Sequence, residues 1–243
     1  MKKAIILGCS HAAGALMFME PGLVLDDNQP QRQTEYGGLN SYPMLVAEMM
    51  GYEPHNHAIS GGSNDAMFRV FAEQEEKYDL VIACWTGMDR GELWHLEHNY
   101  WRPITYGFGT SNQIEPNSIL KQGVETGELV DKHEQYNKYG KQWIAFENNN
   151  QRGFNNKIKN VMALNMLAKH HGTEVINLDS FQGIYDFSWP GDVFRPFDDA
   201  NDEFGNFCIN NDYPSEPSGH FFKPAHQAYA EYIKSRLDYI NNY

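Results

Sequence analysis

Cysteine and basic residues are scarce in this 243-residue chain, and each scarcity excludes a class of protein. The three cysteines, Cys9, Cys84 and Cys208, are widely spaced and odd in number, which argues against a disulfide framework. Lys and Arg total 19 against 32 Asp and Glu, so the formal net charge is −13. Nucleic acids and anionic membranes bind clustered positive charge, and we expect neither as a partner.

Long apolar runs are also missing. A helix that spans a membrane needs about 20 apolar residues, and no stretch approaches that length. The run 4–7, which follows two lysines, is shorter than the roughly 7–15 apolar residues of a secretory signal. We therefore expect no signal peptide, and a cytoplasmic location, or a virion or host-cytoplasm location if the chain is phage-encoded.

Aromatic residues, by contrast, are abundant. They make up 14% of the chain, while charged residues make up only 21%. Disordered chains show the reverse composition, so the chain is expected to fold. Its length suits one large α/β domain or two small ones.

Apolar runs alternate with helical patterns along the first 85 residues. Strands are expected at 3–8, 55–59, 80–84 and 174–178, and helices at 41–51, 66–77, 155–171 and 224–240. The polar segment 21–40 is expected to be a surface loop. Continuous apolar strands between helices predict a parallel sheet covered on both faces, and hence a three-layer α/β/α sandwich of flavodoxin-like topology.

Two segments do not fit this alternation. Residues 91–154 and 182–217 are polar, aromatic and rich in Asn, and both follow strands, where α/β proteins place functional loops. We predict a single domain, 1–243, with these two large insertions. Aromatic faces and Asn amides suit carbohydrate, although the same aromatics could equally anchor long loops on the core.

Three polar clusters lie where chemistry is expected. Ser10 follows the first strand and could act as a nucleophile, with His220, in the loop before the last helix, as its general base. Gly61 and Asn64 follow the second strand and could hydrogen-bond a developing oxyanion. Each cluster also has a simpler interpretation: Ser10 as a helix cap, 60–64 as a turn and cap, and His220 as a surface histidine.

Taken together, these motifs resemble the SGNH (GDSL-like) hydrolases. Segment 8–14, GCSHAAG, is similar to the nucleophile block of that family, and Asn56 with Gly61 is similar to its second block. His220, followed by Ala225 and the final helix, is similar to its last block. The runs 41–51 and 56–69 further resemble a divergent group found in bacteriophage genomes.

Three positions depart from the family pattern. Cys9 replaces the Asp of the first block, and Met88 stands where the family has its oxyanion-hole Asn. A thioether cannot donate a hydrogen bond, so Asn64, or next Thr86, would have to substitute. Pro217 replaces the acid three residues before the histidine. Asp212, Glu216 or a main-chain carbonyl would then have to orient His220.

The resemblance implies a serine esterase, and the aromatic insertions favour an O-deacetylase of a carbohydrate ester, without a cofactor. The histidines lack the spacing of a zinc site, so no metal is expected. The alternative is a catalytically degenerate protein that binds glycans or builds a virion, with virion or homo-oligomeric partners. Met88 and Pro217 favour that alternative. The net charge argues against strongly anionic substrates unless a local basic pocket exists.

Overall fold

The computed structural model describes residues 1–19, 21, 30–88, 90–95, 100–104, 150–181, 183–197, 199–217 and 219–242. Four parallel strands form the main sheet: β1 (Lys3–Gly8), β2 (Glu53–Asn56), β3 (Leu80–Trp85) and β6 (Glu174–Asp179). Their order is β2-β1-β3-β6. The chain therefore crosses from β2 over β1 to β3, as in flavodoxin-like sheets.

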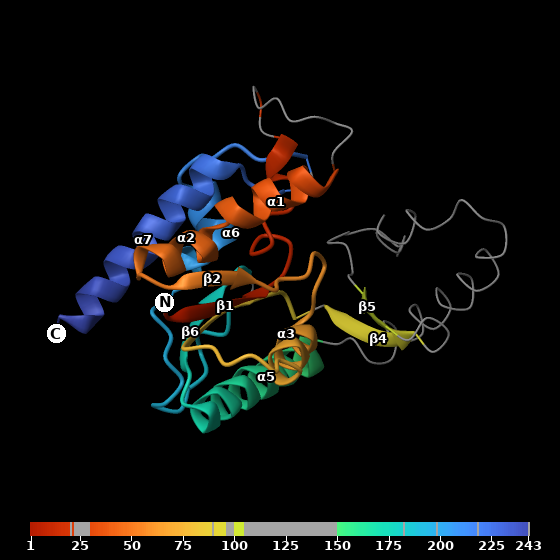
Figure 1. Cartoon of the computed structure of the whole chain (residues 1–243), viewed down its shortest axis with the longest axis vertical. Coiled ribbons are helices and arrows are strands. Elements are labelled where there is room, and N and C mark those ends of the chain that lie inside the picture. Colours follow the sequence, from red (N-terminus) through yellow and green to blue (C-terminus); the bar gives the residue numbers. More distant parts are fainter. Residues whose placement is uncertain are drawn as a thin grey trace.

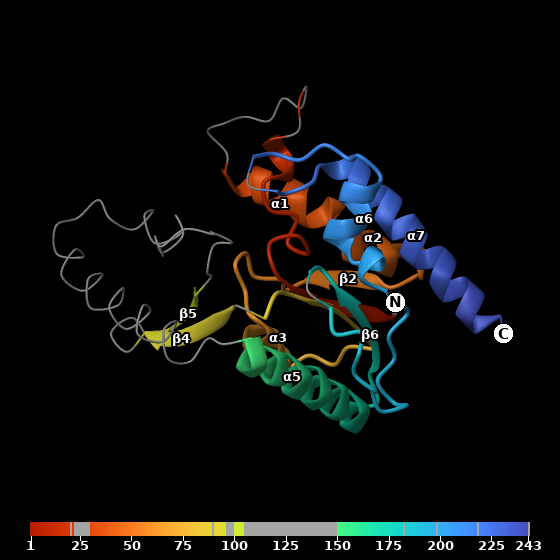
Figure 2. The same ribbon diagram turned by 180° about the vertical axis from the view of Figure 1, so that it is seen from behind.

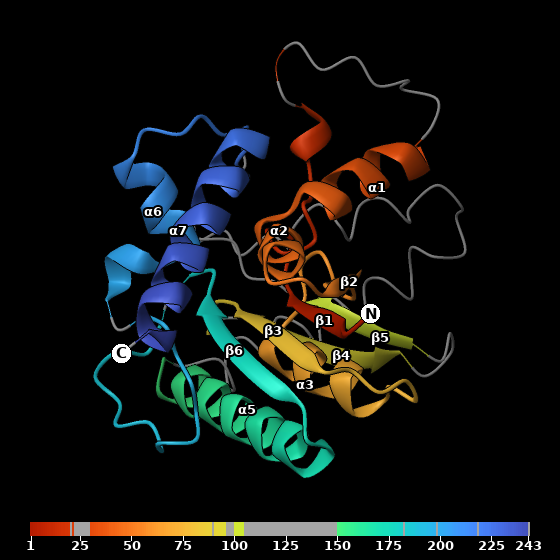
Figure 3. The same cartoon turned by 60° about the vertical axis from the view of Figure 1, so that its left-hand side comes forward.

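Helices cover both faces of this sheet (Figure 1). One face carries α2 (Tyr42–Met49) and α7 (Lys223–Asn241), with α1 (Pro30–Asn40) and α6 (Phe204–Asn210) beside them. The other face carries α3 (Asn64–Ala72) and α5 (Asn150–His171), which pack against each other. Figure 3 shows the sheet between the two groups. The predicted three-layer α/β/α sandwich with a parallel sheet is confirmed.

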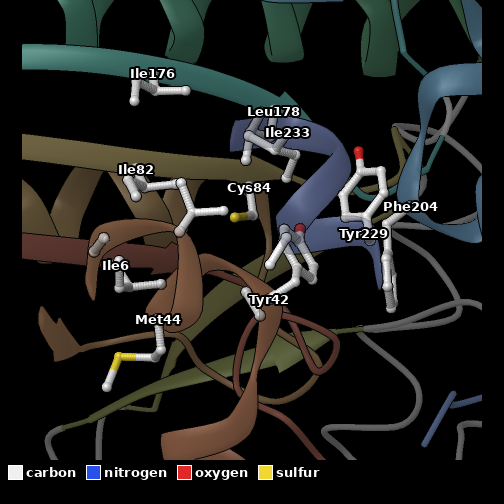
Figure 4. Close-up of a cluster of buried hydrophobic side chains, with 14 of the residues drawn as sticks. Ile6, Tyr42, Met44, Ile82, Cys84, Ile176, Leu178, Phe204, Tyr229 and Ile233 are labelled. Atoms are coloured by element: carbon white, nitrogen blue, oxygen red, sulfur yellow. The ribbon is translucent and has the colours of Figure 1, made fainter. Parts of the chain in front are cut away.

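The strands divide their side chains between two cores because successive residues of a strand point to opposite faces. Ile6, Ile82 and Cys84 point toward α2 and α7, where they meet Tyr42 and Tyr229 (Figure 4). The alternate side chains of β1 and β3 pack against α3 and α5. Both faces of the central strands are thus buried, which explains their continuous apolar sequences.

The prediction of a surface loop at 21–40 was wrong for the second half of that segment, because α1 occupies 30–40. Its sequence contains Gly37 and Gly38 and has no apolar stripe, so local propensity does not favour a helix. Tertiary packing favours the helix, because α1 lies against the turn that contains Gly14. A Cβ on Gly37 would lie 2.0 Å from the carbonyl oxygen of Gly14. Only glycine lets these two backbones approach so closely.

The two predicted insertions contain regular structure in their described parts. A hairpin of β4 (Gly91–His95) and β5 (Tyr100–Ile104) projects beside the main sheet (Figure 2). Residues 105–149 lie outside the described residues. The second insertion contains the short helices η3 (Ala200–Asp202) and α6, which the sequence did not predict. The single-domain prediction stays a prediction. None of the described helices is long and apolar enough to cross a membrane.

Candidate active site

Ser10 lies in a turn at the carboxyl end of β1 and is 6% exposed. The turn closes through backbone hydrogen bonds, from Ala13 N to Cys9 O and from Ala15 N to Ser10 O, each 2.9 Å. The next helical segment is a single 3-10 turn, η1 (Met17–Met19). No α-helix begins at Ser10, so the structure gives this serine no capping role and no helix dipole.

His220 lies in the loop that leads into α7, beside Glu216. The Nδ1 atom of His220 is 3.1 Å from Glu216 Oε1, and the backbone N–H of His220 donates to the same oxygen at 2.8 Å. Glu216 N donates to His220 O at 3.0 Å, which closes the loop. A carboxylate can only accept, so Nδ1 carries the proton and Nε2 has the lone pair that a general base needs.

Asp212, the other acid considered from the sequence, is elsewhere. It is exposed, with a φ of 56°, in the turn that follows α6. Glu216 is buried. The structure therefore brings Glu216, and not Asp212, to the imidazole of His220.

His11 connects the two halves of the site. Its Nε2–H donates to the carbonyl oxygen of Gly219 at 3.2 Å, and its ring centroid lies 5.0 Å from that of His220. Phe181 and Phe204 pack against the same ring, with centroids 4.7 and 5.2 Å away. The residue after Ser10 thus contacts the residue before His220, which holds the two loops together.

Burial lowers the pKa of His220 below its usual value, and the charge of His11 lowers it further. The hydrogen bond to Glu216 acts in the opposite direction but does not cancel the effect. His220 is therefore neutral at pH 7, the state in which it can accept a proton. Among the described residues, no hydrogen bond joins its ring to the Ser10 hydroxyl; such bonds often tighten only when substrate binds.

Gly61 belongs to a turn that packs against the end of β1. Ile59 N donates to Gly8 O at 3.0 Å, and Gly62 N donates to Ile59 O at 2.7 Å. Gly61 itself has a φ of 75°, which favours glycine. Within the described chain, the backbone N–H groups of Ser10 and Gly61 donate to no other residue. Both residues lie at this edge of the sheet and are buried.

Asn64 has partners other than those expected from the sequence. Its side-chain amide donates to the carbonyl oxygens of Thr86 and Gly87, at 3.3 and 3.4 Å, and accepts a hydrogen bond from Thr86 N at 3.0 Å. Asn64 is 2% exposed. The side chain thus fixes the loop after β3, with its amide nitrogen donating to two carbonyl oxygens.

Sequence analysis missed Arg90, which lies just beyond that loop. Its guanidinium carbon is 5.4 Å from the ring centroid of Phe181, the ring that also packs on His11. Burial alone would raise the pKa of the Cys9 thiol, but hydrogen bonding with His11 and the charge of Arg90 outweigh burial and lower it to about 5. The one available signal was a basic residue two positions after Met88.

Asn56, which carried part of the family resemblance, holds the nucleophile turn in place. Its side-chain amide donates to Ala12 O at 3.1 Å, and its Oδ1 accepts from Ala58 N at 3.0 Å. No cluster of three or more His, Cys, Asp or Glu in the described part of the chain is placed to hold a metal ion.

Comparison with known proteins identifies no family. No family model matches the sequence, and no curated protein matches it. The fold is similar to a lipolytic-family (G-D-S-L) protein from Desulfitobacterium hafniense DCB-2, at 13% identity and a TM-score of 0.34, covering 97% of this chain and 99% of that one.

It is also similar to two carbohydrate esterases. One is an acetyl xylan esterase from the rumen bacterium Butyrivibrio proteoclasticus (12% identity, TM-score 0.42, 99% of this chain and 64% of that one). The other is a family two carbohydrate esterase from Cellvibrio japonicus (12% identity, TM-score 0.44, 99% of this chain and 61% of that one). This chain thus spans less than two thirds of either esterase. With TM-scores below 0.5, these similarities carry no assignment of family or activity.

Proposed function

We propose that this chain is a serine ester hydrolase in which Ser10, His220 and Glu216 form the catalytic triad. The observation that carries the proposal is the contact of 3.1 Å between His220 Nδ1 and Glu216 Oε1, in a loop that His11 holds against the Ser10 turn. This arrangement supplies a nucleophile, a neutral base and an acid that orients the base, in the roles that the reaction requires.

In this proposal, Ser10 Oγ bonds to the acyl carbon of an ester while His220 Nε2 takes the hydroxyl proton. The alcohol then leaves with that proton, and an acyl-enzyme remains. Water, deprotonated by His220, releases the carboxylate and restores Ser10. The backbone N–H groups of Ser10 and Gly61 donate to the oxyanion. Glu216 stabilises the imidazolium that forms at each proton transfer.

The finer parts of the proposal are an O-acetylated carbohydrate as substrate and a divergent, bacteriophage-type SGNH hydrolase as the kind of protein. The substrate is supported by the aromatic and Asn-rich composition of 91–154 and 182–217. These segments follow β3 and β6, whose carboxyl ends lie at the same edge of the sheet as Ser10. Nucleic acids and membranes are not proposed as partners, because the chain is strongly acidic.

Release of acetate from O-acetylated oligosaccharides tests this function. The unaltered chain should release acetate, and the Ser10→Ala and His220→Gln variants should lose nearly all of that activity while keeping the melting temperature of the parent. If the unaltered chain binds the oligosaccharides but releases no acetate, the degenerate glycan-binding alternative replaces the enzyme. The departures at Met88 and Pro217 are the features that favour that outcome.

A further inference from the structure

The proposed reaction, on which this inference rests, has only neutral donors assigned to the oxyanion. Met88 ends in a thioether, which cannot donate a hydrogen bond. The side-chain nitrogen of Asn64 donates to the carbonyl oxygens of Thr86 and Gly87. The backbone N–H groups of Ser10 and Gly61 remain, together with the Thr86 hydroxyl, which is buried and has no hydrogen-bond partner among the described residues. Preorganised donors are commonly the largest contribution to catalysis of acyl transfer, so a charged donor at the same edge of the sheet would add to these neutral ones.

The same edge of the sheet holds a cation, Arg90, with a donor that no described residue satisfies. Arg90 Nη1 is buried and has no hydrogen-bond partner among the described residues. No described carboxylate pairs with this guanidinium, whereas Arg69 is paired with Glu92 and Arg195 with Asp179. Acidic residues outnumber basic ones by 32 to 19, so an unpaired buried guanidinium nitrogen calls for a physical explanation. The Cys9 thiol, whose pKa the charge of Arg90 helps lower to about 5, provides part of that explanation. A ligand or reaction intermediate that carries negative charge would in addition give Arg90 Nη1 a hydrogen-bond partner.

A chain of ring contacts places Arg90 beside the candidate site, and the effect of its charge on the site agrees with that placement. Its guanidinium lies over the Phe181 ring, that ring packs on His11, and His11 lies beside His220 at 5.0 Å between centroids. Its positive charge also acts on both sides of the site, since it lowers the pKa of Cys9, next to Ser10, and that of His220.

We propose that Arg90 is a catalytic residue whose guanidinium donates a hydrogen bond to the oxyanion formed when Ser10 attacks the ester. The carbonyl oxygen becomes negative as the bond from Ser10 Oγ to the acyl carbon forms, and loses that charge when the alcohol leaves. A guanidinium remains charged at all relevant pH values and offers donors in a fixed plane. It therefore stabilises the negative oxygen more than the neutral carbonyl, which is the differential binding that catalysis requires.

Chemical rescue of Arg90→Ala tests this role. The variant should lose about 10²–10³-fold in kcat with little change in KM, the usual cost of removing one oxyanion donor. Guanidinium chloride at low millimolar concentration should restore part of kcat in a saturable way, while sodium chloride should not. Arg69→Ala is the matched control, because Arg69 is ion-paired with Glu92 on the neighbouring hairpin and should be dispensable for activity.

Several results would overturn the proposal. Arg90→Ala could be as active as Arg69→Ala, or could be folded and inactive without any rescue by guanidinium, which would indicate a structural role. The loss could also disappear in a Cys9→Ser background, which would show that Arg90 only balances the thiol of Cys9. If the unaltered chain hydrolyses no ester, the proposed function fails and this inference fails with it, a result distinct from an active parent with an active Arg90→Ala variant.

Discussion

One carboxylate, that of Glu216, lies against the ring of His220 and supports the proposed role of His220 as a base. Pro217 stands three residues before His220 and has neither a carboxylate nor a backbone N–H, whereas Glu216 stands four residues before it. The loop closes by the hydrogen bond from Glu216 N to His220 O, which brings Glu216 Oε1 to both the backbone and the ring of His220. The spacing of four residues between Glu216 and His220 therefore still places a carboxylate beside Nδ1 of His220.

The Glu216→Gln variant should separate this electrostatic role from a structural one. The amide can still accept a hydrogen bond, but the negative charge that raises the pKa of His220 is gone. We expect kcat to fall about 10²-fold or more. The acidic limb of the pH profile should move to lower pH, because the pKa of His220 falls further below its usual value.

Asp212→Asn is the matched control for that experiment. Asp212 is exposed and lies in the same connection between α6 and α7, and Asn tolerates its left-handed backbone. Its activity and pH profile should match those of the parent. A shifted profile in Asp212→Asn, or an unshifted one in Glu216→Gln, would contradict the assignment of Glu216.

Sequence reasoning named Ser10, His220, Gly61 and Glu216 as candidates because turn residues and strand ends are visible in a sequence. It could not choose between Asp212 and Glu216, since that choice depends on how the loop closes. It also could not foresee that the amide of Asn64 is engaged by carbonyl oxygens on another loop. Which donors of a side chain remain available depends on tertiary contacts, and the sequence does not record them.

At the scale of elements, the approach of α1 to the nucleophile turn depends on two glycines. A Cβ on Gly37 would lie 2.0 Å from Gly14 O, whereas a Cβ on its neighbour Gly38 would have no atom closer than 3.9 Å. Gly37→Ala should therefore destabilise the protein by about 3 kcal/mol, because the backbones must separate. Gly38→Ala should be neutral or stabilising by up to about 1 kcal/mol, since alanine favours a helix.

Urea denaturation of the two variants measures this difference. They stand next to each other in one helix and carry the same chemical change, so propensity effects are shared. Equal stability of Gly37→Ala and Gly38→Ala would show that the close approach of α1 to the Ser10 turn is not required for the fold.

The His11 contact joins two loops that are 208 residues apart in the sequence. His11→Phe keeps a ring between Phe181 and Phe204 but removes the hydrogen bond to Gly219 O. We expect kcat to fall about tenfold, because the loop that carries His220 loses one hydrogen bond to the Ser10 turn, which contributes about 1 kcal/mol. The acidic limb of the pH profile should move to higher pH, because the charge of His11 lowers the pKa of His220.

The opposite directions of the shifts in His11→Phe and Glu216→Gln make the pair informative. General destabilisation of the site would lower kcat in both variants but would not move the two acidic limbs apart. If the acidic limbs of the pH profiles of both variants coincide with that of the parent, neither residue acts on the ionisation of His220.

At the scale of the whole molecule, the strands and outer helices were predictable because burial imposes a repeating pattern. β1 and the long helices α5 and α7 carry strong apolar patterns, and the structure contains all three. Helix α1, without such a pattern, forms through contacts that are remote in sequence. The same limit explains α6, which lies in a segment rich in Asp and Asn.

The net charge of −13 should influence which esters reach the site. An ester that bears an additional carboxylate should have a kcat/KM about tenfold below that of a neutral ester of equal size at low ionic strength. Salt at 0.5 M should reduce this difference in kcat/KM between the two esters, because screening weakens the repulsion. If the difference in kcat/KM between the two esters does not change with salt, local contacts and not the field of the whole molecule set the preference for the neutral ester.

The central claim is that Ser10 is an activated nucleophile, and covalent labelling tests it most directly. Treatment with a fluorophosphonate, followed by intact mass and peptide mapping, should show one adduct per chain, located on Ser10. Labelling should be absent in Ser10→Ala and much slower in His220→Gln. An unlabelled parent chain, or an equal rate of labelling in the parent and His220→Gln, would contradict the account.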